Sequence, residues 1–500
     1  MNRQDFDALA LQGYNRIPLQ EQVLADLETP LSLYLKLTAG VGGSKNSFLL
    51  ESVVGGERFG RYSFIGLPCN TRLEARNFGP DAYVNIIKND EVVETHVANP
   101  LDFIAEYQKR FKVALQANMP RFCGGLAGYF GYDAVRHIEK KLEATCPPDE
   151  LDCPDILLLQ CEELAVIDNL SGKIHFIVYV NPNDNNAYEL GLAKLSQLKQ
   201  LLKQPVIAPE MVATNSSGEV IRDFAKQDYL ASVETAKDLI AAGDFMQVQV
   251  GQRIKKKFNA SPINLYRALR SLNPSPYMYF YNFGEFQVVG ASPEILVRQE
   301  TLADQQQKVT IRPLAGTRPR GASPEADKAI EQELVKDPKE IAEHVMLIDL
   351  ARNDVGRIAQ TGSVKVTEAF AVERYSHVMH IVSNVEGILL PGLTSMDVLK
   401  ATFPAGTLTG APKVHAMELI DQLEPVKRGI YGGACGYISY ADDMDLAIAI
   451  RTAVVKDNMV YTQASAGVVA DSVPELEWAE TEHKARALLK AVELVEGGQL

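Results

Sequence analysis

The chain has 500 residues, of which 46% are hydrophobic and 23% charged, and its formal net charge is −14. This length exceeds what one hydrophobic core usually fills, and the ordinary composition excludes a disordered, collagen-like or coiled-coil chain. The negative charge repels phosphate backbones and anionic lipid, which argues against nucleic acid and membranes as partners. No apolar run is long enough to span a bilayer.

The cysteines and the N-terminal segment bear on the cellular compartment. The six cysteines are scattered and none forms a C-x-x-C pair, so we predict reduced thiols rather than a disulfide framework. The first residues, MNRQDFD, lack the apolar stretch of a secretory signal. We therefore expect a cytoplasmic protein.

The first part of the chain, which we assign to residues 1–204, ends in a predicted hairpin and a helix. Within residues 163–180 the strands ELAVID and KIHFIVYV flank a turn at NLSG. Leucines then recur at helical spacing over residues 190–202. The stretch that follows collects Pro, Ser, Asn and Gly, and we interpret residues 205–224 as a linker.

The remaining residues, 225–500, form the second predicted domain. The segments MQVQVGQRI, YMYFYNF and FQVVGA are typical of strands, and helices are expected over 337–352, 409–422 and 474–493. Strands dominate between these helices, without a regular alternation of strand and helix. We therefore predict an α+β fold in which large antiparallel sheets are packed with helices.

Two of the predicted helices carry paired glutamates. In DPKEIAEH, Glu340 and Glu343 lie three residues apart on one face, and in DSVPELEWAE, Glu477 and Glu480 share a face with Lys484. Magnesium takes one or two protein carboxylates together with water and an anionic substrate. Such pairs are also ordinary on solvated helix faces, and the pattern alone favours that second explanation.

Three further tracts have compositions suited to binding a small anion. PLAGTRPRG at 313–321 offers glycine N–H groups, a hydroxyl and two guanidiniums, and FPAGTLTGAPK at 403–413 places a Gly/Thr turn before a helix. YSHVMH at 375–380 carries two histidines three residues apart. Together with the glutamates, these tracts suggest a Mg²⁺-dependent site for a small polycarboxylate.

At these tracts the chain resembles anthranilate synthase component I, within the family of chorismate-utilising enzymes. The matching stretches extend over about residues 25 to 490 and include LLES, GRYSFIG, NPSPYMYF, GASPE, RPLAGTRPRG, KEIAEHVMLIDLARND, FPAGTLTGAPK, IYGGACGY and QASAGVVADSVPELEWAETEHKA. The resemblance implies a chorismate-binding fold, with the catalytic domain at residues 225–500. It also implies a lyase that converts chorismate and ammonia to anthranilate and pyruvate through aminodeoxyisochorismate, the first step of tryptophan biosynthesis.

The resemblance assigns Mg²⁺ to the paired glutamates. The ion would lie between Glu343 and Glu480, supported through water by Glu340 and Glu477, and would hold the ring carboxylate of chorismate. The positions implied to bind substrate are Gly316, Thr317, Tyr431, Arg451, Ala466, Gly467 and Lys484. For Lys484, a salt bridge to Glu480 one turn away is the alternative role.

The resemblance also names the residues that would take part in the chemistry. Glu294 would protonate the departing C4 hydroxyl, and His380 would assist the loss of pyruvate, with Thr407 and Gln247 beside them. Two further features depart from the family pattern, namely Ser465, where a glycine is usual, and Cys435, where a small aliphatic residue is common.

Two positions select among the related synthases. Ala315 stands where similar aminodeoxychorismate synthases carry a nucleophilic lysine, and Gln247 stands where isochorismate and salicylate synthases carry a lysine general base. Neither side chain can replace that lysine, so attack by free ammonia is implied.

Ammonia needs a source, and no G-x-C-x-G amidotransferase motif is apparent in the sequence. The resemblance therefore implies a separate glutamine amidotransferase subunit, component II, in a heterotetramer of two copies of each component. It also implies feedback inhibition by tryptophan, bound by Glu51, Ser52, Arg61, Pro276, Tyr277, Met278, Cys435 and Tyr437.

Three alternatives stay open on the sequence alone. An aminodeoxychorismate synthase would use the same chemistry and release a different product. A tryptophan-binding regulatory subunit would keep the fold without turnover. A structural α+β protein would carry the glutamate pairs by coincidence, which the number of matching motifs makes the weakest of the three.

Overall fold

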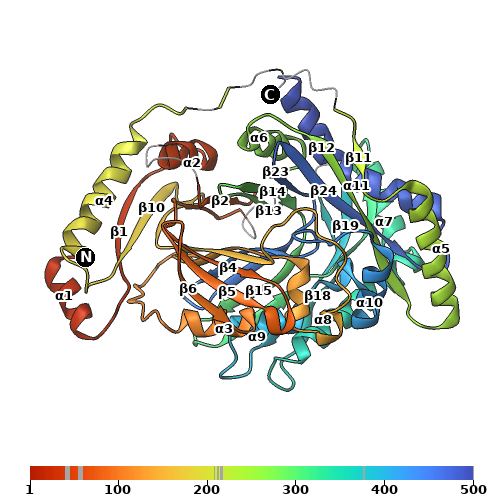
Figure 1. The fold of residues 1–500 in the computed structure, drawn as a ribbon, viewed down its shortest axis with the longest axis horizontal. Helices are drawn as coiled ribbons and strands as arrows, with labels where there is room; N and C mark the ends of the chain where they lie inside the picture. Colours follow the sequence, from red (N-terminus) through yellow and green to blue (C-terminus); the bar gives the residue numbers. More distant parts are fainter. Residues whose placement is uncertain are drawn as a thin grey trace.

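The computed structural model describes residues 1–39, 45–53, 60–207, 209–210, 213, 218–375 and 378–498. Two large antiparallel sheets dominate it (Figure 1). The first sheet runs in the order β1 (Ile17–Leu24), β10 (Lys173–Val180), β9 (Glu163–Asp168), β3 (Tyr62–Gly66), β2 (Ser47–Glu51), β13 (Tyr277–Asn282), β14 (Phe286–Ser292), β23 (Thr452–Lys456), β24 (Met459–Val468), β12 (Gln247–Lys257) and β11 (Ile221–Arg222), with β20 (Gly410–Ala411) paired to β12.

The second sheet is built in the same antiparallel way. Its order is β17 (Leu314–Pro319), β19 (Val378–Ile388), β16 (Gln307–Ile311), β15 (Ile295–Thr301), β22 (Met444–Ile448), β21 (Ala434–Ser439), β7 (Gly125–Phe130), β8 (Ile156–Cys161), β4 (Thr71–Arg76), β5 (Tyr83–Lys88) and β6 (Glu91–Val97), with β18 (Lys365–Arg374) paired to β19.

Helices cover the outer faces of the two sheets. On the first sheet lie α2 (Pro30–Ala39), α4 (Ala187–Leu202), α6 (Pro262–Leu272) and α11 (Pro474–Glu496), and on the second lie α3 (Pro100–Gln108), α8 (Pro338–Gly356) and α9 (Ser395–Thr402) (Figure 1). The other helices are α1 (Arg3–Leu11), α5 (Lys226–Ala242), α7 (Pro324–Leu334) and α10 (Lys413–Leu423).

Between the sheets lies a core that is rich in aromatic rings. Phe48 of β2 packs against Phe122 and against Tyr281 of β13, and Phe122 stacks on Tyr437 of β21 with ring centroids 4.4 Å apart. Burial of such large rings is among the strongest contributions to a core. The predicted α+β fold with large antiparallel sheets is therefore confirmed, as two sheets packed face to face.

Strands from both sides of the predicted linker share each sheet. In the first sheet Glu51 of β2 pairs with Met278 of β13, and in the second Phe130 of β7 pairs with Ala434 of β21. Residues 1–204 and 225–500 thus contribute to common cores. The division of the chain at residues 205–224 stays a prediction, and of these, residues 208, 211–212 and 214–217 lie outside the described part.

The predicted local elements are largely confirmed. The hairpin forms as β9 and β10, and the three strands of the second region form as β12, β13 and β14. In α4, Leu195 and Leu198 are buried as the leucine spacing predicts, whereas Leu190 at its start is 62% exposed. All six cysteines are free thiols. None of the helices that the structure describes combines the length and apolar composition needed to cross a bilayer.

The helix predicted from residue 409 begins later. Residues 410 and 411 pair with β12, and Pro412 precedes the first residue of α10, Lys413. The start predicted at 409 is therefore wrong, because the glycine–alanine segment satisfies its backbone hydrogen bonds in the sheet. The helix predicted at 337–352 is α8, whose start is fixed by Asp337, which accepts from the backbone N–H groups of Lys339 and Glu340.

Candidate active site

Side chains from distant segments converge at one place between α8, α11 and the ends of several strands. Gln247, at the start of β12, donates its Nε2 to Oε1 of Glu343 on α8 at 3.3 Å. Thr407, in the turn before α10, donates to Oε1 of Glu294 at 3.0 Å. The charge of Lys484 on α11 also acts on Glu294. The fold thus brings these five residues together, although each comes from a different stretch of the sequence.

Glu294 is a buried carboxyl in the turn between β14 and β15. Burial raises its pKa to about 7, against the hydrogen bond from Thr407 and the positive charges of Arg451 and Lys484, which lower it. A carboxyl with such a pKa holds its proton in a large fraction of molecules at neutral pH. It is therefore equipped to donate a proton to a leaving group.

Of the four glutamates of α8 and α11, Glu343 and Glu480 interact from one helix to the other, and Glu340 and Glu477 each interact with a neighbour on their own helix. Burial raises the pKa of Glu343, and the neighbouring carboxylates of Glu340 and Glu480 raise it further. Burial also raises the pKa of Glu477, to which Glu480 adds. Glu340 accepts a hydrogen bond from Nη1 of Arg318 at 2.9 Å. Two helices thus place several carboxylates in mutual repulsion, which a cation between them would relieve.

Two cations, Arg451 and Lys484, lie close enough to Glu480 to interact with its carboxylate. Lys484 forms a 2.6 Å ion pair with Glu480, the alternative role predicted for it, and also donates to the carbonyl oxygen of Ser465 at 2.8 Å, whereas its binding of substrate stays a prediction. Burial lowers the pKa of Arg451, whereas Tyr431, Glu294 and Glu480 raise it. The side chain of Arg451 is therefore a cation inside the site.

Ser465, one of the two predicted departures from the family pattern, takes part in a hydrogen-bond chain. Tyr431 donates its hydroxyl to Oγ of Ser465 at 2.9 Å, and Ser465 donates to Oε1 of Gln249 at 2.9 Å. Its cross-strand partner on β12 is Gly251, and a Cβ there would lie 3.4 Å from the Cβ of Ser465. That distance is ordinary van der Waals contact, and the same Cβ would lie closer to Oε1 of Glu424, at 3.1 Å.

The segment around Gly316 holds His380. Gly316 has φ +66°, at a bulge in the pairing of β17 with β19, and its carbonyl oxygen lies 3.3 Å from Nδ1 of His380. The hydroxyl of Thr317 lies 3.0 Å from the same nitrogen. Burial lowers the pKa of His380 to about 4, so the imidazole is neutral at pH 7 and can accept a proton. The other histidine of this tract, His377, lies outside the described residues.

Gly467 on β24 lies against the ends of two glutamine side chains, which would have to move if this residue carried a Cβ. A Cβ at this position would lie 2.6 Å from Nε2 of Gln247 and 2.8 Å from Nε2 of Gln249, both closer than van der Waals contact allows. Ala466 before it is fully buried, opposite Val250 of β12.

A second pocket collects most residues predicted to bind tryptophan. It lies between β2, β13 and β21 and has a cavity volume of about 80 Å³. Seven of the eight predicted residues line it, namely Glu51, Ser52, Pro276, Tyr277, Met278, Cys435 and Tyr437. Arg61 does not, and instead lies in a neighbouring hollow with its Nη2 3.3 Å from Oδ2 of Asp168.

Two charged residues of this pocket, Arg298 and Asp445, are not predicted from the sequence. Nε of Arg298 donates to Oδ2 of Asp445 at 2.9 Å, and the hydroxyl of Tyr277 donates to Oδ1 at 3.0 Å. The carboxylate of Glu51 accepts from Tyr266 and from Nε of Arg270. Arg298 and Asp445 lie opposite each other on β15 and β22, a pairing that no local motif reveals.

Comparisons with known proteins agree with this geometry. The family model for chorismate binding enzymes matches residues 63–490. Anthranilate synthase component 1 of Neisseria meningitidis serogroup A is 54% identical over 100% of this chain and 99% of its own length, and that of Pseudomonas aeruginosa is 55% identical over 99% of each.

Solved structures give the same result for the fold. Anthranilate synthase component I from Streptococcus pneumoniae matches with a TM-score of 0.74 and 36% identity, over 94% of this chain and 99% of that one. The menaquinone-specific isochorismate synthase from Escherichia coli, at 19% identity and a TM-score of 0.69, shares the fold over 98% of both chains. The chain belongs to the chorismate binding enzymes and, within them, to the anthranilate synthase component 1 family.

Proposed function

We propose that this chain is a lyase that converts chorismate and ammonia to anthranilate and pyruvate, through aminodeoxyisochorismate, in the first step of tryptophan biosynthesis. The observation that carries the proposal is Glu294, a buried carboxyl with a pKa of about 7, held by Thr407 in a site that also contains Arg451 and Lys484. With this pKa the carboxyl of Glu294 can be protonated at neutral pH, and a protonated carboxyl is what the expulsion of a hydroxyl group requires.

Cationic and neutral donors orient the substrate. Arg451 binds the enolpyruvyl carboxylate, and Tyr431 joins it by turning its hydroxyl from Ser465 to the substrate, because a guanidinium and a hydroxyl satisfy a carboxylate together. Gly316, Thr317, Ala466 and Gly467 line the rest of the site through backbone groups and one hydroxyl. Fixing the ring in this way places its C4 hydroxyl at the carboxyl of Glu294.

In the first half-reaction ammonia forms a C–N bond to the ring as the C4–O bond breaks. Glu294 gives its proton to the departing hydroxyl, which leaves as water. In the second half-reaction the neutral His380 removes the ring proton while the bond from the ring to the enolpyruvyl oxygen breaks, which makes the ring aromatic, and the departing enolpyruvate takes up a proton at its CH2 carbon to become pyruvate. Thr317 and the carbonyl oxygen of Gly316 hold His380 in place.

Attack by ammonia rather than by a lysine or water follows from two side chains. Ala315 is buried and has no nucleophile. Gln247 already donates to Glu343 and cannot accept a proton at working pH, so it is no base for water. These two positions favour anthranilate over the products of the related synthases.

The carboxylates of α8 and α11 have the oxygen-only chemistry that magnesium prefers, although no three acidic, histidine or cysteine side chains of the described residues gather closely enough to hold an ion together. They offer only oxygen donors, and the pKa values of Glu343 and Glu477 are raised partly by neighbouring carboxylates. Glu343 and Glu480 would hold the ion directly, and Glu340 and Glu477 would support it. When bound, Mg²⁺ supplies a Lewis acid for the ring carboxylate of chorismate.

Two further parts of the proposal concern partners and regulation. Ammonia comes from a glutamine amidotransferase, component II, in a cytoplasmic heterotetramer with two copies of each component. Tryptophan inhibits by binding in the pocket lined by Glu51, Tyr277 and Tyr437, with the carboxylate of Glu51 near its amino group and aromatic walls around its indole.

One assay tests the function directly. The purified chain is incubated with chorismate, Mg²⁺ and excess ammonium at alkaline pH, and anthranilate fluorescence is followed with and without tryptophan. We expect fluorescence that requires Mg²⁺ and falls with tryptophan. A non-fluorescent amine made from chorismate would mean an aminodeoxychorismate synthase, and tryptophan binding without turnover would mean a regulatory subunit.

A further inference from the structure

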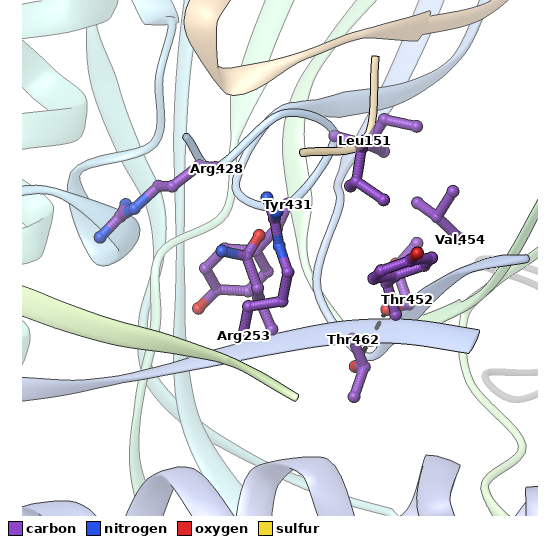
Figure 2. Close-up of a pocket in the computed structure, with 10 residues that line it drawn as sticks. Leu151, Arg253, Arg428, Tyr431, Thr452, Val454 and Thr462 are labelled. Carbon is purple, nitrogen blue, oxygen red and sulfur yellow. Dashed lines mark hydrogen bonds between the residues drawn. The ribbon is translucent and has the colours of Figure 1, made fainter. Parts of the chain in front are cut away.

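A buried ion pair, Glu424 with Arg428, lies next to the turn that carries Thr407. Only 5% of Glu424 and 3% of Arg428 is exposed. The side chain of Arg428 points away from that of Arg253 (Figure 2). Its Nε donates to Oε2 of Glu424 at 2.9 Å and its Nη2 to Oε1 at 2.6 Å. Two parallel bonds of this kind fix the orientation of both groups, which a lysine cannot reproduce.

The other hydrogen bonds of Arg428 join two separate segments of the chain. Its Nη1 donates to the carbonyl oxygen of Leu408 at 2.6 Å, and Leu408 is the last residue of the 3-10 turn η4 (Gly406–Leu408). Its Nη2 also donates to the carbonyl oxygen of Gln249 on β12 at 3.1 Å. Arg428 therefore ties the turn that contains Thr407 to the strand β12.

Glu424 and two aromatic rings keep the guanidinium in this place. Oε1 of Glu424 accepts a second hydrogen bond, from the backbone N–H of Gly251 on β12, at 2.8 Å. The guanidinium carbon of Arg428 lies 4.6 Å from the ring centroid of Tyr132 and 5.7 Å from that of Tyr431. The pair is thus fixed to β12 through Glu424 and confined by the rings.

Loss of Arg428 would leave the carbonyl oxygen of Leu408 without this hydrogen bond. Leu408 is buried, and a buried carbonyl oxygen without a partner is costly, which favours a turn that has moved. Because Thr407 directly precedes Leu408, the move would displace the hydroxyl that donates to Glu294. Apolar residues often stabilise a fold as well as a buried ion pair does, so stability alone does not account for the pair.

We propose that Glu424 and Arg428 position Thr407 for catalysis, an inference that rests on the proposed synthase function. By fixing Leu408 relative to β12, the pair keeps the hydroxyl of Thr407 3.0 Å from Oε1 of Glu294. Arg428 acts through Leu408 and Thr407 rather than on the substrate, so it is a positioning residue.

The test replaces the pair with neutral side chains of similar size, Arg428→Met together with Glu424→Gln. Glutamine keeps an acceptor for the N–H of Gly251, and no charge is left buried alone, so we expect a near-native Tm. The kcat for anthranilate should fall about 10²-fold, because a small displacement at the site is enough for such a loss. The KM for chorismate should change less, and tryptophan binding should be unchanged.

The pH–rate profile separates positioning from a general weakening of the fold. The hydrogen bond from Thr407 lowers the pKa of Glu294, so its loss should move the alkaline fall in rate to higher pH. Arg451 and Lys484, whose charges also act on Glu294, are unchanged in the paired variant. Adding Thr407→Val should shift the profile no further, since both changes remove the same hydrogen bond. A full additional shift would overturn the proposal.

The neighbouring ion pair of Lys427 and Asp155 is the matched control. Both residues are buried and lie 2.7 Å apart, and the other carboxylate that Lys427 contacts is Asp149. Lys427→Met together with Asp155→Asn should keep the native kcat and pH profile. An equal loss of activity in the two paired variants would overturn the proposal.

A crystal structure of the Arg428→Met, Glu424→Gln protein decides the matter without turnover. Oγ1 of Thr407 should lie beyond hydrogen-bond distance of Oε1 of Glu294, and an unchanged separation would overturn the proposal. Absence of anthranilate formation by the native chain would count against the proposed function alone. If this variant does not fold, Arg428→Lys, which keeps a charge beside Glu424, takes its place with the same expectations.

Discussion

At the scale of single residues, the pKa of Glu294 should set the pH dependence of the reaction. With a pKa of about 7, the carboxyl loses its proton as the pH rises above 7, so the rate at a fixed concentration of unprotonated ammonia should fall on the alkaline side. Glu294→Gln should lower kcat by about 10²–10⁴-fold and remove this dependence. The measurement is a pH–rate profile of anthranilate formation for both proteins.

Thr407→Val is the control for the origin of that pKa. The hydrogen bond from Thr407 lowers the pKa of Glu294, so its loss should raise the pKa further. The alkaline fall in rate should then move to higher pH. A profile that is unchanged, or that moves to lower pH, would show that another group titrates.

Residue identities at the site are readable from motifs, whereas their contacts are not. Glu294, Thr407 and His380 can be named from the sequence because each lies in a distinctive tract. The chain from Tyr431 through Ser465 to Gln249 depends on three segments meeting, and no pattern within any of them predicts it. The same holds for Arg298 and Asp445, which only the pairing of two strands brings together.

At the scale of elements, α8 and α11 act as a pair. Glu343→Ala should abolish Mg²⁺-dependent turnover, because it removes one of the two carboxylates proposed to hold the ion, and should leave tryptophan binding intact. Glu493→Ala, an exposed position on α11, is the matched control and should keep full activity. Anthranilate assays across a Mg²⁺ titration decide this, and retained activity in Glu343→Ala would remove the metal from the proposal.

His137, the last residue of the short 3-10 helix η2 (Tyr132–His137), should make the free energy of unfolding depend on pH. Burial and the charge of Lys427 lower the pKa of His137 to about 4, below its usual value near 6.5. The unfolded chain therefore binds a proton first as the pH falls from 6.5 to 4, which destabilises the folded state. In His137→Gln the free energy of unfolding should fall less steeply over this range, by at most about 1.4 kcal/mol per pH unit.

Denaturant unfolding at several pH values provides the measurement. Identical slopes for the native protein and His137→Gln would mean that His137 titrates alike in the folded and unfolded states.

The boundaries of an element follow from local chemistry wherever neighbouring residues satisfy the backbone hydrogen-bonding groups at its end. Asp337 and the proline after it fix the start of α8, but the start of α10 depends on β12, which takes residues 410 and 411 into the sheet.

At the scale of the whole molecule, the tryptophan pocket draws on both halves of the chain. Ser52→Phe should fill it and relieve inhibition without lowering the maximal rate, because Ser52 is far along the chain from the catalytic motifs and lines only this pocket among those described. Arg61→Ala should keep nearly native tryptophan sensitivity, since Arg61 pairs with Asp168 in a separate hollow. Inhibition curves of anthranilate formation test both variants.

If Ser52→Phe keeps its sensitivity, the pocket is not the feedback site. If Arg61→Ala loses sensitivity to tryptophan, the hollow beside Tyr62 takes part as well.

The fold class can be predicted from the sequence because strand and helix patterns are local and because the chain resembles a known family. The order of strands was not, since pairing of β2 with β13 and of β7 with β21 joins segments that share no pattern.

The interleaved strands also constrain how the chain reaches its folded state on the ribosome. Glu51 cannot pair with Met278, nor Phe130 with Ala434, until most of the polypeptide has been synthesised. Until then, β2 and β7 have unpaired edges and their aromatic faces are exposed, and both features promote aggregation. A gene fragment that stops at the apparent linker should yield an insoluble product, whereas two co-expressed fragments divided there have all the strands they need to assemble.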